Sequence, residues 1–121
     1  MADISKTEIL KAVRKALNPE KVEQSFIYWY KTVIQKDQPI KVGTLSIAMP
    51  FDGTIVFVDL APRANWAHPC LYILVDTKTL ETKILEASLP PDIDQFDESY
   101  IILLRYGEIP PHERYFNAFD K

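Results

Sequence analysis

The first part of the chain carries apolar residues at helical spacing, namely Ile9, Val13, Ala16 and Leu17. Ser5 and Glu8 stand three residues apart, which is the S-x-x-E pattern of a capping box at a helix N-terminus. Asn18-Pro19 follows, and the residue before a proline disfavours the α conformation. The pattern predicts a helix that begins after Ser5 and ends before Asn18.

A second helix is predicted over residues 19–35. Asn18 is suited to cap it, and Pro19 is suited to its first position. Apolar side chains then recur every three or four residues at Val22, Phe26, Trp29, Tyr30 and Val33. The alternative is a long strand, because residues 26–34 are rich in aromatic and β-branched types. The periodicity favours the helix.

From residue 40 the pattern changes to short apolar runs separated by proline, glycine and acidic residues. These runs predict strands at about 43–49, 54–60, 70–76, 82–88 and 100–106. We expect the buried centre of the sheet to contain Val56, Val58, Ile73, Val75 and Ile102. Helices followed by a series of strands indicate an α+β fold, with N-terminal helices packed on one face of a mostly antiparallel sheet of about four to six strands.

The length of 121 residues suits one domain, with a helical part at 1–36, a sheet at 40–106 and a tail or short helix at 107–121. The net charge is only −3, and no basic patch suggests a nucleic-acid partner. Cys70 is the only cysteine, so no internal disulfide can form. With neither a signal peptide nor a membrane span in the pattern, we expect a cytoplasmic protein that needs no cofactor.

The sequence RANWAHPC, at residues 63–70, is the first candidate for function. It lies in a connection between two predicted core strands that is too long for a tight hairpin, and long loops often bind partners. Arg63, Asn65, Trp66 and His68 are the residues of a possible recognition surface, since Trp and Arg are frequent anchors at interfaces. The alternative is a connecting loop whose Trp66 covers the edge of the core.

A second candidate is the acidic stretch with Asp92, Asp94, Asp97 and Glu98 and no basic residue between them. Charge runs of this kind usually form a solvated connection. The other interpretation is an acidic patch that attracts a basic protein partner and accelerates its association.

His68 and Cys70 suggest thiol chemistry, with His68 as base and Cys70 as nucleophile. On a strand, residues i and i+2 lie on the same face about 6 to 7 Å apart, which is too far for a direct hydrogen bond unless Pro69 bends the chain. A free cysteine that begins an apolar strand is commonly a small hydrophobic residue. A metal site built from His68, Cys70, His112 and a carboxylate such as Asp59 lacks the paired ligands of zinc sites, so we predict none.

Residues 51–106, with DGTIVFVD, WAHPCLYILVD, TKILEAS and YIILLRY, resemble the sheet of the permuted papain-like cysteine hydrolases, relatives of cell-wall amidases and lecithin–retinol acyltransferase. In this resemblance His68 matches the catalytic histidine, Glu86-Ala87 the returning strand and Arg105 the last strand. The family places its nucleophilic cysteine after the sheet, where this chain has YFNAFDK and Ala118. The resemblance therefore implies a degenerate, non-catalytic relative.

Together these patterns favour a small non-enzymatic binding module, such as an adaptor, accessory subunit or regulatory domain, whose recognition surface is the loop 61–70. The expected partner is another protein, and association with further copies of the chain stays open. The alternative is a thiol-dependent hydrolase or acyltransferase with His68 as its base.

Overall fold

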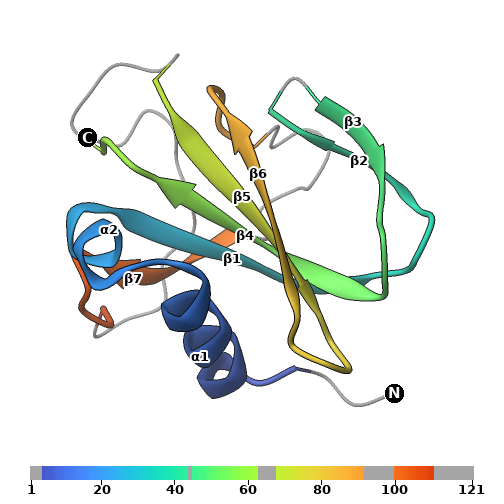
Figure 1. The fold of residues 1–121 in the computed structure, drawn as a ribbon, viewed down its shortest axis with the longest axis horizontal. Coiled ribbons are helices and arrows are strands. Elements are labelled where there is room, and N and C mark those ends of the chain that lie inside the picture. The colour runs from blue at the N-terminus through green and yellow to red at the C-terminus, as the bar shows by residue number, and fades with distance from the viewer. Residues whose placement is uncertain (1–3, 44, 63–67, 92–99, 111–121) are drawn as a thin grey trace.

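The computed structural model describes residues 4–43, 45–62, 68–91 and 100–110, and contains helices followed by strands (Figure 1). The helices are α1 (Lys6–Ala16) and α2 (Pro19–Gln24). The strands are β1 (Phe26–Ile34), β2 (Pro39–Val42), β3 (Leu45–Ala48), β4 (Gly53–Asp59), β5 (Cys70–Asp76), β6 (Thr82–Ala87) and β7 (Tyr100–Arg105). No helix among these residues is long and apolar enough to cross a membrane.

Five of the strands form one antiparallel sheet in the order β6-β5-β4-β1-β7. Strands β2 and β3 form a separate antiparallel hairpin. Both helices contribute side chains to one face of the sheet, and Figure 1 shows α1 lying across that face. The predicted α+β class, with N-terminal helices on a mostly antiparallel sheet, is confirmed.

Local sequence signals begin both helices. At α1, Ser5 Oγ accepts a hydrogen bond from the Glu8 backbone N–H at 3.1 Å, and Glu8 Oε1 accepts one from the Ser5 N–H at 3.2 Å. This is the predicted capping box. At α2, Asn18 Oδ1 accepts from the Lys21 N–H at 2.8 Å, and Pro19 occupies the first turn.

The predicted helix over residues 19–35 is wrong beyond residue 24, and so is the helical assignment of 1–36 as a whole. Residues 26–34 form β1, which lies between β4 and β7 inside the sheet. Tyr28 is not among the apolar positions of the predicted helix, yet it is buried and stacks on Phe57, with ring centroids 5.7 Å apart. Both faces of this strand are covered from residue 27 to 29, so consecutive residues there are apolar. A continuous apolar run contains residues at helical spacing as well as at strand spacing, and it therefore resembles a helix.

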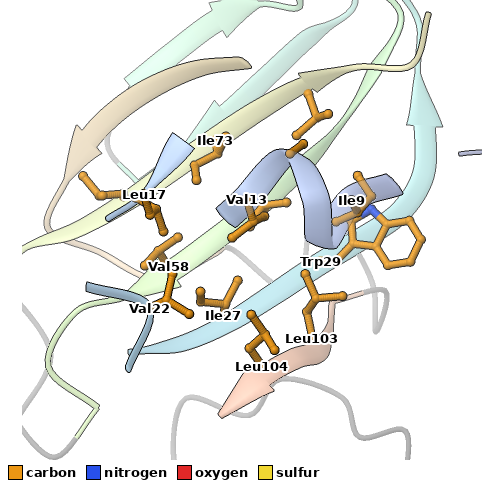
Figure 2. Packing of buried hydrophobic residues seen from close by; sticks show 14 of the residues in the cluster. Ile9, Val13, Leu17, Val22, Ile27, Trp29, Val58, Ile73, Leu103 and Leu104 are labelled. Carbon is orange, nitrogen blue, oxygen red and sulfur yellow. The ribbon is translucent and has the colours of Figure 1, made fainter. Parts of the chain in front are cut away.

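The main hydrophobic core lies between the two helices and the sheet (Figure 2). Ile9 and Val13 of α1 pack over Trp29 of β1 and its neighbours on the sheet. In β7 the pairing with β1 shifts by one residue between Ile27 and Tyr28, so Leu103 and Leu104 both join this core. Such a bulge lets two consecutive side chains pack on the same layer.

The opposite face of the sheet is rich in aromatic residues. Tyr28, Phe57, Tyr72 and Tyr100 are buried there together with Met49 of the segment after β3. The predicted strand at 43–49 is in fact the second half of the β2–β3 hairpin, which contributes Ile40 and Val42 to this core.

The five residues predicted for the centre of the sheet are all buried. They divide between its two faces, with Val56, Val58, Ile73 and Val75 on the helix side and Ile102 on the aromatic side.

Candidate functional site

A buried polar pair joins the two ends of the loop between β4 and β5. Asp59 is the last residue of β4, and His68 stands two residues before Cys70, where β5 begins. His68 Nε2 lies 2.7 Å from Asp59 Oδ1, and both side chains are more than 90% buried. Asp59 and Cys70 also face each other in the β4–β5 ladder. Asp59 and His68, which we call the loop-base pair, thus link the last residue of β4 to the residue two positions before β5.

The local hydrogen bonds explain why an aspartate is tolerated at the end of a buried strand that has no other charged residue. Asp59 Oδ1 accepts a second hydrogen bond from the Ala61 backbone N–H at 3.1 Å, which turns the chain out of the sheet. Burial of a carboxylate is costly unless hydrogen bonds compensate it. Asp59 meets this requirement with one backbone and one imidazole partner.

Cys70 and Tyr72 lie side by side on the aromatic face and share one acceptor, the backbone carbonyl of Leu89. The thiol donates to Leu89 O at 3.4 Å, and the phenol donates to the same oxygen at 2.8 Å. The segment after β6 is therefore tied across the start of β5. Both side chains are almost completely buried, and their hydrogen bonds to Leu89 hold parts of the chain together.

The surroundings of Cys70 suppress its ionisation. Burial, followed by the negative charge of Asp59, raises the pKa of the Cys70 thiol from 9.0 to about 12. Burial also raises the pKa of Tyr72. A nucleophilic cysteine needs the opposite arrangement, namely an accessible thiol whose pKa is lowered by a nearby cation. The geometry therefore argues against Cys70 as the nucleophile.

Of the residues predicted for recognition, the structure describes only His68, which is buried in the loop-base pair. Arg63, Asn65 and Trp66 lie outside the described residues, as do the acidic residues Asp92, Asp94, Asp97 and Glu98. His112, the distant member of the rejected metal set, also lies outside them. Within the described ranges no group of three or more His, Cys, Asp or Glu side chains could hold a metal ion.

Sequence reasoning missed the role of Asp59. The sequence suggests Asp59 only as one carboxylate of a metal set and does not predict its pairing with His68. A signal was present, because Asp59 is a charged residue at the end of a run of six strand residues without a charge. A charge in that position requires a partner once the strand is buried.

Comparison of the chain with protein-family models, with curated proteins and with solved structures found no match.

Proposed function

We propose that this protein is a small binding module, of the adaptor, accessory-subunit or regulatory type, whose recognition surface is the loop 61–70. The observation that carries this proposal is the loop-base pair. A 2.7 Å hydrogen bond between buried side chains joins the residues at which the loop leaves β4 and returns to β5.

This arrangement suits recognition because a binding loop must be ordered when its partner docks. A loop whose two ends are already fixed on a rigid sheet loses less conformational entropy on binding than a loop with free ends. The support here is extensive, since all seven β4 residues and six of the seven β5 residues are buried. Binding residues are often carried in this way, on loops that a rigid scaffold positions.

The composition of the loop indicates the type of partner. Arg63 and Trp66 belong to the residue types that most often dominate binding energy at protein interfaces. A tryptophan in such an interface buries a large apolar surface, and an arginine adds directed hydrogen bonds to acidic or carbonyl groups. A protein surface with an apolar pocket beside an acidic group is therefore the expected partner.

The test is a quantitative affinity capture from cell extract with four immobilised forms of the chain. Trp66→Ala and Arg63→Ala are compared with the wild type, and Leu45→Ala is the matched control because Leu45 is exposed on β3, which belongs to the separate β2–β3 hairpin. We expect specific proteins that the wild type and Leu45→Ala retain and that both loop variants lose.

Thermal denaturation of the same forms separates binding from folding. The proposal requires that Trp66→Ala leave the melting temperature nearly unchanged. A fall of about 4 °C or more, which corresponds to about 1 kcal/mol for a domain of this size, would show that Trp66 packs on the core of its own chain. Equal capture by the wild type and both loop variants would refute the loop as the recognition surface.

A further inference from the structure

The two edges of the main sheet differ in exposure. The edge strand β7 has five of its six residues buried, whereas no residue of the edge strand β6 is fully buried. Across the described residues, β6 pairs with β5 alone, through the register Cys70↔Ala87 to Val75↔Thr82. Among the described residues no strand covers its outer side, which leaves backbone N–H and C=O groups there that another strand can pair with.

The side chains of β6 alternate between the two faces of the sheet. Ile84 faces Ile73 and so points to the helix side, together with Thr82 and Glu86. Leu85 packs against the aromatic core, so Lys83 and Ala87 share its side. Ile84, in the middle of the strand, is 42% exposed although its neighbour Ile73 is completely buried. The apolar side chains on the helix side of the sheet therefore extend to the edge strand, where Ile84 is partly exposed to solvent.

We propose that two copies of this chain associate edge to edge through β6, as antiparallel strands related by a two-fold axis at Ile84. Two-fold related contacts are isologous, so the same strand supplies both halves of the interface. Residues that stand opposite each other in an antiparallel pair lie on the same face. A symmetric pair must therefore be centred on one residue, and that residue meets its own copy.

The side chains select Ile84 as that central residue. Centring on Lys83 or on Glu86 would place like charges directly opposite each other, which destabilises a strand pair. Centring on Leu85 would place Ile84 opposite a charged glutamate of the other copy. With Ile84 at the axis, the two exposed isoleucines meet, Thr82 stands opposite Glu86 of the partner subunit, and Lys83 stands opposite the partner's Leu85.

This register explains how a strand with two charges can still form an interface. Neither charge faces its like, and the Thr82 hydroxyl can donate a hydrogen bond to the partner's Glu86. The contact between the isoleucines extends the helix-side core of each copy across the interface. Residues 82–87 contain no glycine or proline, so every residue of β6 can take part in backbone pairing with a second strand.

A cysteine cross-link tests the register. The native Cys70 is only 1% exposed, so a thiol introduced on β6 is the reactive one. In the proposed dimer the two thiols of Ile84→Cys face each other with Cβ atoms about 4.5 to 5.5 Å apart, close enough to form a disulfide under mild oxidation. Glu86→Cys is the matched control on the same face, because its two thiols would lie about four residues, or about 13 Å, apart along the strands.

Sedimentation equilibrium from micromolar to millimolar protein measures the association itself. We expect a reversible dimer that Ile84→Lys weakens by about tenfold or more, since it brings two lysines together at the axis. Leu45→Lys introduces the same charge at a similarly exposed leucine of β3 and should leave the dimer intact. Circular dichroism of both variants establishes that they fold.

Two results would overturn the proposal. One is cross-linking that is equally efficient at positions 84 and 86, which indicates random collision. The other is a wild-type chain that stays monomeric throughout the concentration range. If the wild-type chain is monomeric and captures another protein that the Ile84→Lys variant does not capture, the edge binds a different protein and the dimer is excluded.

Discussion

The indole N–H of Trp29 in β1 donates a hydrogen bond of 3.2 Å to Thr54 Oγ1 in β4, within the core beneath α1. Trp29 stands opposite Val56 in the ladder, so Thr54 is its diagonal neighbour two residues along β4. Both side chains are buried, and the hydroxyl allows a large aromatic ring to enter the core without leaving its one donor unpaired. A polar residue in the centre of the sheet is thereby explained.

Thr54→Val keeps the shape of the side chain and removes this acceptor. A buried N–H without a partner costs about 1 to 3 kcal/mol, so we expect the free energy of unfolding to fall by that amount in urea titrations. Thr32→Val, at an exposed position of β1, should change it by less than about 0.5 kcal/mol. Equal stability of Thr54→Val and the wild type would show that the hydrogen bond adds nothing to stability.

Ile73 and Ile84 provide a matched pair of core and edge positions, because they face each other between β5 and β6. We expect Ile73→Ala to cost about 2 to 5 kcal/mol, through lost burial and the cavity left behind. Ile84→Ala removes the same atoms from a position that is 42% exposed, and should cost less than about 1 kcal/mol in dilute protein. Similar losses for both variants in equilibrium denaturation would contradict the placement of the core.

The loop-base pair can be tested without touching the loop itself. Asp59→Ala removes the acceptor of two hydrogen bonds, from His68 and from the Ala61 N–H, and should lower the free energy of unfolding by about 1 to 3 kcal/mol. Asp59→Asn retains a side-chain carbonyl in the same place and should lose less. Hydrogen exchange of the amides at 61–69 should accelerate in Asp59→Ala, and unchanged exchange would argue against the bracing role.

Cys70 should react with thiol reagents only when the protein unfolds. At neutral pH its raised pKa and its burial leave almost no accessible thiolate, so labelling in native buffer should be slow and should become fast in denaturant. Rapid labelling of the folded protein would restore the possibility of a reactive thiol.

The same shift predicts a pH dependence of stability. Above pH 9.0 the thiol of the unfolded chain ionises while the folded thiol stays protonated up to about pH 12. The unfolded state then binds fewer protons, so stability is retained below pH 9.0 and decreases as the pH rises through this window. Cys70→Ala should remove this part of the alkaline loss, as measured by denaturation at a series of alkaline pH values.

Local elements of this fold could be predicted from the sequence. The first helix begins at Ser5 because a side chain and backbone groups three residues apart satisfy each other, which requires no tertiary contact. The pattern also predicts the strands β4, β5, β6 and β7, since short runs of β-branched and aromatic residues between turn signals are typical of strands. The core positions Val56 and Ile73 followed from the same runs.

Residues 26–34 show where the sequence alone was insufficient. Their apolar pattern is compatible with a helix, and the preference for a strand comes from contacts that are distant along the chain. Ile27 faces Val58 on one side and Leu104 on the other, which are more than thirty and more than seventy residues away in the sequence. Pairing on both edges and burial on both faces override the local periodicity in this strand.

For the candidate site, too, some features could be predicted from the sequence and others depended on the tertiary structure. The sequence by itself marked the loop 61–70 and His68 as candidates, because residue types and loop length are local properties. Only the tertiary structure decided that His68 pairs with Asp59 and that Cys70 is buried beside them with a raised pKa. Both outcomes depend on the register between β4 and β5, which places Asp59 opposite Cys70, and a register is fixed by packing of the whole sheet.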